Sequence, residues 1–126
     1  MMLKSACVIG VVLGLGAGLA HAADTRCQNT SRRMLDHLDR GDYSGATADF
    51  DARMKAALGA DQLARIWPAI AQKLGARGAR EPAHGERANG YALVVTPLHY
   101  GKSLVDAQVA CDADGKVAGF YIKPHS

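Results

Sequence analysis

Two amphipathic segments between Tyr43 and Gly75 most limit how this chain can fold. In the first segment, residues suited to burial recur at spacings of three and four, at Tyr43, Thr47, Phe50, Met54 and Leu58. In the second segment they recur at Leu63, Ile66, Trp67, Ile70 and Leu74. This spacing lines one side of an α-helix, so each segment is predicted to be a helix with one face to bury. The rest of the chain must supply the surface on which those faces pack.

Short polar residues and glycines predict where the helices begin and end. A third helix, ahead of the other two, would place Met34, Leu35 and Leu38 on one face. The predicted N-caps are Asn29, Thr30 or Ser31 for this helix, Asp42 or Ser44 for the next, and Asp61 for the last, and the predicted ends are Gly41, Gly59 and Gly75. Pro68 lies inside the last helix, where a kink is expected because proline cannot donate to the preceding turn.

From Gly75 onward the pattern changes: the run Gly75–Arg80 is loop-like, and the segments that follow have the pattern of strands. Strands are predicted at Tyr91–Thr96, where Pro97 interrupts the run, at Leu104–Cys111 and at Val117–Ile122. The stretch from Glu81 to Arg87 is ambiguous between a loop and an edge strand. These elements predict an α+β domain of three N-terminal helices packed on a curved antiparallel sheet of three to four strands. The hollow between helices and sheet is the default place for a ligand.

The first 22 residues have the features of a signal peptide. Lys4 is followed by an uncharged run, and Ala20-His21-Ala22 is a small-x-small cleavage site. Cleavage there would leave residues 23–126 as a single domain with a formal charge of +2, compared with +3 for the whole chain. We therefore expect a periplasmic or secreted protein with no stable membrane span after cleavage.

Two cysteines, Cys27 and Cys111, remain once Cys7 is removed with the signal peptide. Two cysteines in an exported domain of this size are expected to pair, because the compartment is oxidising. In the chain-entropy model, a loop of this length makes the disulfide worth about 4 kcal/mol.

The chain resembles the bacterial family known as domain of unknown function 3887. The residues that carry the resemblance are Gly41-Asp42-Tyr43, Phe50, Met54-Lys55, Leu58, Leu63, Trp67, Gly75 and the run from Asp114 to Phe120. The resemblance implies the cystatin-like cone of the nuclear transport factor 2 superfamily, with helices packed into a curved antiparallel sheet. It supplies no catalytic residues.

Several kinds of chemistry are disfavoured by the residues themselves. The charges are mixed along the chain and aromatic residues are scarce, so nucleic acid is not an expected partner. The histidines are dispersed, and the Asp112-x-Asp114-Gly115 sequence lacks the glycine and glutamate spacing of a calcium-binding loop. No metal and no cofactor are therefore expected.

Three functions remain open. The favoured one is a non-enzymatic module that binds a small apolar ligand or an unknown protein. Its candidate pocket residues are Phe50, Met54, Trp67 and Tyr91, although core packing is the favoured interpretation of these same residues. An alternative, suggested by the superfamily, is a proton-transfer enzyme using Asp106 or His99. The alternation of its strand places Asp106 opposite Val105 and Val109, and therefore toward water if those two face the helices. The third function is a small envelope inhibitor that blocks another enzyme with a loop such as Gly78–Gly90.

Overall fold

A computed structural model describes residues 25–126, in which helices come first and strands follow. Residues 25–39 are helical and are called the N-terminal helix below. The further helices are α2 (Tyr43–Ala46), α3 (Ala52–Ala57) and α4 (Ala60–Leu74), and the strands are β1 (Arg77–Arg80), β2 (His84–Ala88), β3 (Tyr91–Tyr100), β4 (Ser103–Cys111) and β5 (Val117–Pro124). The predicted α+β class is confirmed, with four helices and five strands in the described residues instead of three and three to four.

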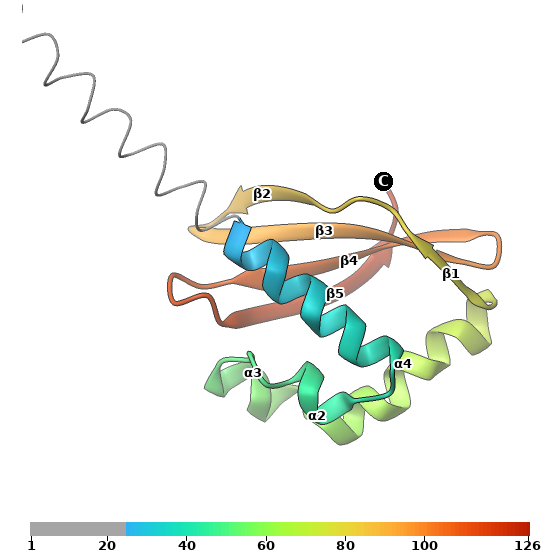
Figure 1. The fold of residues 1–126 in the computed structure, drawn as a ribbon, viewed down its shortest axis with the longest axis horizontal. Coiled ribbons are helices and arrows are strands. Elements are labelled where there is room, and N and C mark those ends of the chain that lie inside the picture. Colours follow the sequence, from blue (N-terminus) through green and yellow to red (C-terminus); the bar gives the residue numbers. More distant parts are fainter. Residues whose placement is uncertain (1–24) are drawn as a thin grey trace, which may run out of the picture.

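The strands form one open antiparallel sheet. The order is β1-β3-β4-β5, and β2 also pairs with β3, so β1 and β2 follow one another along the same edge of β3. Figure 1 shows α2, α3 and α4 on one side of the strands, with the N-terminal helix running across the sheet. The segment from Gly78 to Gly90 was predicted to be an inhibitory loop. Most of it instead belongs to the two short strands β1 and β2.

The core lies between the helices and one face of the sheet. Alternation along β3 and β4 turns one set of side chains toward the helices, and these residues are buried: Val94, Leu98, Tyr100, Val105, Ala107 and Val109. The helices meet them with Leu35, Leu38, Leu63 and Trp67. Because the helices cover only one face of the sheet, no helix packs on the other face, which we call the helix-free face.

The N-terminal helix begins earlier than the sequence predicted. Residues 25–30 are already helical, so Thr30 and Ser31, predicted as N-caps, lie inside the helix, where both are buried. The predicted end is confirmed. Gly41 adopts a positive φ of 74° and donates its amide to the carbonyl of Leu38, while the backbone amide of Asp42 donates to the backbone carbonyl of His37. This paired arrangement is the usual way of ending a helix at glycine.

The segment predicted as one helix from Tyr43 to Leu58 is broken in two. Between α2 and α3 the backbone runs beside β5, with Phe50 in a parallel bridge to Val117. The amide of Val117 donates to the backbone carbonyl of Asp49 (2.8 Å), and the amide of Asp51 donates to the backbone carbonyl of Val117 (2.9 Å). Asp51 then caps α3 by accepting from the amide of Met54 at 2.7 Å. Pairing with the sheet therefore replaces helical bonds in the middle of an apparently continuous helical pattern.

Helix α4 also departs from the predicted pattern. Its N-cap is Gly59, whose amide donates to the side chain of Gln62 at 2.9 Å, and Asp61 lies in the first turn instead of capping. Of the predicted apolar stripe, Leu63 and Trp67 are buried and Ile70 packs partly against the core, whereas Ile66 and Leu74 are exposed.

Strand β3 continues through Pro97, where the sequence predicted an interruption. The carbonyl of Pro97 accepts from the amide of Glu81 at 2.9 Å, so it faces the edge where β1 and β2 lie. In an extended strand the nitrogen and the oxygen of one residue point to the same side. The missing N–H of Pro97 therefore falls where the β1–β2 edge is interrupted, and β3 keeps its register with β4.

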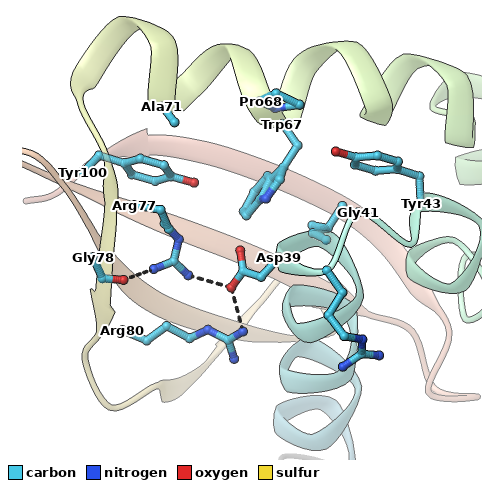
Figure 2. Close-up of a pocket in the computed structure, with 12 residues that line it drawn as sticks. Asp39, Gly41, Tyr43, Trp67, Pro68, Ala71, Arg77, Gly78, Arg80 and Tyr100 are labelled. Atoms are coloured by element: carbon cyan, nitrogen blue, oxygen red, sulfur yellow. Dashed lines mark hydrogen bonds and ion pairs between the residues drawn. The ribbon is translucent and has the colours of Figure 1, made fainter.

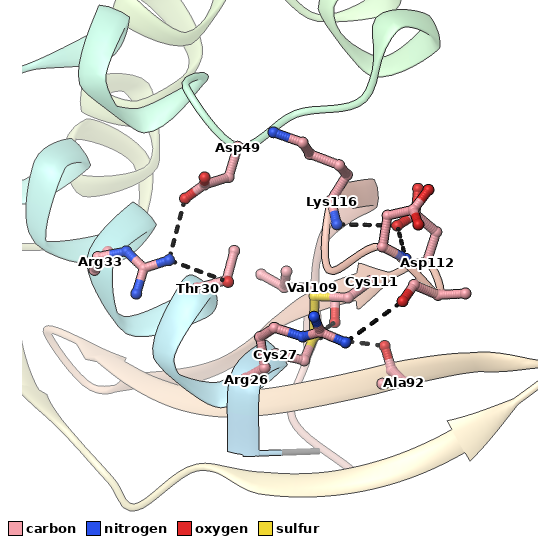
Figure 3. The surroundings of a disulfide bond; sticks show 12 residues. Arg26, Cys27, Thr30, Arg33, Asp49, Ala92, Val109, Cys111, Asp112 and Lys116 are labelled. Atoms are coloured by element: carbon pink, nitrogen blue, oxygen red, sulfur yellow. Dashed lines mark hydrogen bonds and ion pairs between the residues drawn. A yellow bond between two sulfur atoms is a disulfide. The ribbon is translucent and has the colours of Figure 1, made fainter. Parts of the chain in front are cut away.

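The predicted disulfide between Cys27 and Cys111 is confirmed (Figure 3). It ties the N-terminal helix to the end of β4, with Cα atoms 5.9 Å apart, and Arg26 donates to the carbonyl of Ala113 beside it. The predicted signal peptide lies outside the described residues. Among residues 25–126, no helix is both long and apolar enough to cross a membrane.

Candidate functional site

A groove of about 690 Å³ opens between the end of the N-terminal helix, α4 and the β1–β3 edge (Figure 2). We call it the Trp67 groove. The residues that give it chemical character are Asp39, Tyr43, Trp67, Arg77, Arg80 and Tyr100. Its volume falls in the range typical of small-molecule sites.

Two glycines allow α4 to approach the end of β3 closely enough to form one wall of this groove. Gly75 ends α4 and Gly101 follows β3, and both have positive φ, at 115° and 56°. A side chain on Gly101 would place its Cβ 2.6 Å from the carbonyl oxygen of Leu74, which real contacts do not allow. Glycine at this position is therefore required by both the backbone conformation and the close approach.

The floor of the groove is an ion-pair network. One oxygen of Asp39, in the last turn of the N-terminal helix, accepts from Arg77 at 3.1 Å and from Arg80 at 2.9 Å. Arg80 also pairs with Asp36 at 2.8 Å, and Arg77 donates to the carbonyl of Gly78. Burial alone would lower the pKa of Arg80, but its hydrogen bonds to Asp39 and Asp36 outweigh that effect and raise the pKa above its ordinary value. Two cations facing two anions leave the floor nearly neutral.

Tyr100 supplies a protonated hydroxyl at this floor. Its side chain is buried, and burial raises the pKa of the hydroxyl, with the charge of Arg77 opposing the rise. The guanidinium carbon of Arg77 lies 5.5 Å from the ring centroid, within the range of a cation–π contact. The Nε atom of Arg77 is buried without a hydrogen-bond partner among the described residues.

Figure 2 shows how the remaining polar atoms lie. The hydroxyls of Tyr43 and Tyr100 point toward Trp67 from opposite sides, and the second oxygen of Asp39 points toward it from below. The groove thus offers hydroxyl groups that both donate and accept, and a carboxylate oxygen that accepts. This arrangement suits the binding of a small molecule that carries both kinds of hydrogen-bonding group.

The structure separates the four residues predicted to line an apolar pocket. Phe50 is fully buried in the core, and Met54 packs against the core from α3. Trp67 alone lines the groove, with 7% of its surface exposed, whereas Tyr91 is 36% exposed and lies on the helix-free face. Sequence reasoning missed Asp39, Arg77, Arg80 and Tyr100. The sequence signal that could have indicated part of this site is the pair Arg77 and Arg80, which lies in the run predicted to be loop-like.

The predicted catalytic candidates lie on the face of the sheet turned away from the helices. Asp106 does point away from Val105 and Val109, but it does not face water: it is 5% exposed, and its carboxylate lies 2.7 Å from Nδ1 of His125, which covers it. His99 is 44% exposed at its side chain and lies 2.8 Å from the carboxylate of Glu81. Within residues 25–126, no hydrogen bond or ion pair joins His99 to Asp106.

Within the same residues, no three side chains of His, Cys, Asp or Glu gather in a way that could hold a metal ion. The family model described as "Protein of unknown function (DUF3887)" matches residues 31–120. No curated protein and no solved structure matches the chain.

Proposed function

Because the chain belongs to DUF3887, a family of proteins of unknown function, we propose its role from the site: an exported, non-enzymatic module that holds a small molecule in the Trp67 groove. Export is supported by the features of residues 1–22 and by a disulfide, which is typical of oxidising compartments. The stacking of helices on one face of an antiparallel sheet supports the proposed cystatin-like cone.

One observation carries the ligand-binding proposal: polar atoms and perturbed groups converge on one groove. Three described groups have clearly shifted pKa values, and two of them, Arg80 and Tyr100, line this groove. The third, Asp42, follows directly after the groove residue Gly41. A concave site with convergent polar groups and shifted pKa values is the expected form of a binding site. The proposed ligand is a small molecule with both hydrogen-bond donors and acceptors.

Trp67 provides the reporter for a test, because it is the only tryptophan in the chain and lines the groove. The purified, oxidised protein would be titrated with three classes of probe: phenols, aromatic carboxylates and monosaccharides. We expect at least one class to change the Trp67 fluorescence saturably, at a stoichiometry of one ligand per chain.

Paired variants then locate the binding. Tyr100→Phe removes a hydroxyl from the groove, and Tyr121→Phe removes one from an exposed tyrosine on the opposite face of the sheet. A lost hydrogen bond of about 1.4 kcal/mol weakens binding about tenfold, so Tyr100→Phe should raise the Kd by up to that factor while Tyr121→Phe leaves it unchanged. Equal affinity in wild type and Tyr100→Phe, or no response to any probe class, would refute the proposal.

The alternative of a proton-transfer enzyme is supported by one observation, the buried carboxylate of Asp106 in contact with an imidazole. Such a pair is a recognised source of general acid–base chemistry. Under this alternative, Asp106→Ala and His99→Ala would abolish turnover of a substrate found by screening. Under the binding proposal, both variants leave the response of Trp67 to its probe unchanged.

A further inference from the structure

A second groove, distinct from the Trp67 groove, lies on the other flank of α4. Ile66, Ile70 and Leu74 recur every four residues along α4 and form a stripe whose middle residue, Ile70, packs partly against the core and whose two ends are exposed. Ile66 is 50% exposed and Leu74 is 38% exposed. An uncovered apolar stripe on a small protein is a feature of binding surfaces.

The stripe continues into a cavity of about 490 Å³ between α4 and the ends of β4 and β5. Its apolar walls are formed by Ile70, Leu74, Leu104, Val105, Ile122 and Pro124, and Ser103 is the one uncharged polar residue among the lining residues. Because the stripe runs along the helix axis, from Ile66 to Leu74 over about 12 Å, the surface is elongated. An extended chain fits this shape better than a compact ring.

The charges around this groove are all of one sign. Lys73 and Lys123 are the charged residues that line it, and no acidic residue does. Asp106, which pairs in register with Lys123, faces away and is bound to His125. The ammonium of Lys123 lies 5.5 Å from the centroid of the Tyr121 ring, and its register with Asp106 places its side chain on the helix-free face, so Lys73 is the cation on the helix side.

From this combination we propose that the groove binds one molecule of a single-chain anionic amphiphile, a free fatty acid, from solution. The alkyl chain lies along Ile70, Leu74 and Ile122, and the carboxylate lies near Lys73. Burial of the alkyl chain supplies the driving force, since removing apolar surface from water is favourable roughly in proportion to its area. The charge on Lys73 selects a carboxylate over an uncharged head group.

The test uses decanoate at a concentration below that at which it forms micelles, with 1-decanol as the uncharged probe of equal length. Titration calorimetry on the oxidised protein should show one decanoate per chain and weaker binding of decanol. Leu74→Glu, at an already exposed position, should weaken both probes at least tenfold. Lys73→Glu should weaken decanoate by a similar factor and leave decanol unchanged. Lys55→Glu, the same charge change on α3, should affect neither.

Circular dichroism of each variant checks that the fold is retained, and Lys73→Glu keeps the test decisive if Leu74→Glu fails to fold. Unchanged decanoate binding in Lys73→Glu would overturn the proposal. So would sedimentation with anionic vesicles in the absence of decanoate binding, which would indicate a membrane surface as the occupant. A dimer that Leu74→Glu dissociates, again without decanoate binding, would indicate a second copy of the chain and would also overturn it.

Discussion

Breaking the bond between Cys27 and Cys111 is expected to remove a large part of the stability of this protein. The two residues are 84 positions apart along the chain, and their Cα atoms lie 5.9 Å apart in the folded state. In the chain-entropy treatment, a cross-link that closes a loop of that length lowers the entropy of the unfolded chain and so raises its free energy by about 4.5 kcal/mol. Small domains have net free energies of unfolding of about 5 to 15 kcal/mol, so the reduced protein should be marginally stable.

Urea titration of the oxidised and the thiol-reduced wild-type protein isolates the cross-link, because the two forms otherwise contain the same residues. The free energy of unfolding should fall by about 3 to 4.5 kcal/mol on reduction, the lower figure allowing for residual structure in the reduced chain. The slope of that free energy against urea should rise, since the reduced unfolded chain exposes more surface. The double variant with Cys27→Ala and Cys111→Ala should be less stable still, because both side chains are buried and their truncation leaves a cavity.

The reasoning would be refuted by a loss below about 1 kcal/mol, which is no larger than the effect of an average single substitution. An unchanged urea slope together with a large loss would also contradict it, because the effect would then arise in the folded state and not in the unfolded chain.

Three further predictions concern the helix ends and the Trp67 groove. Gly101→Ala should destabilise the protein by at least 1 kcal/mol more than Gly90→Ala in urea titrations, since both glycines have positive φ but only Gly101 lies against a backbone carbonyl, that of Leu74; equal losses would show that the close approach does not matter. The amide of Gly45, and secondarily His37, lowers the pKa of the Asp42 carboxyl. The stabilising contribution of this N-cap should therefore be complete above the ordinary carboxyl pKa of about 3.9 and should decline as pH falls below it. In acid titrations, the Asp42→Asn variant should lack this decline. Burial raises the pKa of Tyr100, so an ultraviolet titration should show a tyrosine ionisation step above the ordinary pKa of about 10, and the stability that Tyr100 contributes below about pH 10 should be lost as pH rises through its folded pKa; persistence of that step in Tyr100→Phe would contradict this assignment.

Much of the fold could be predicted because local patterns and the tertiary structure agree. The period of α4, the alternation of β4 and the glycine at position 41 each specify an element that forms as expected. The disulfide was also predictable, since the predicted cleavage leaves two of the three cysteines, and two cysteines allow one pairing.

The errors occur where tertiary contacts override local patterns. Phe50 fits the helical period, but its backbone pairs with Val117 far along the chain, and no local signal reveals that bridge. Pro97 normally argues against a central strand, but it is accommodated because the neighbouring edge is interrupted beside it. In both cases the deciding partner is remote in sequence.

The Trp67 groove could be only partly predicted, for the same reason. Trp67 was a candidate, but Asp39, Arg77 and Arg80 come from a helix and a strand that are separated by about 40 residues and meet only in the folded chain. Periodicity identifies which residues are buried, whereas a polar site depends on which charged residues the topology brings together. The position of Asp106 shows a related limit: the side of the sheet was predicted from alternation, but its cover by His125 was not.

The most direct test of the Trp67 groove as the binding site is chemical-shift mapping with the probe that changes Trp67 fluorescence most strongly. Binding in the groove predicts that the largest perturbations fall on the indole N–H of Trp67 and on the amides of Gly41, Gly78 and Tyr100. Perturbations confined to the helix-free face around Tyr91 and Tyr121, with the indole signal unmoved, would contradict it.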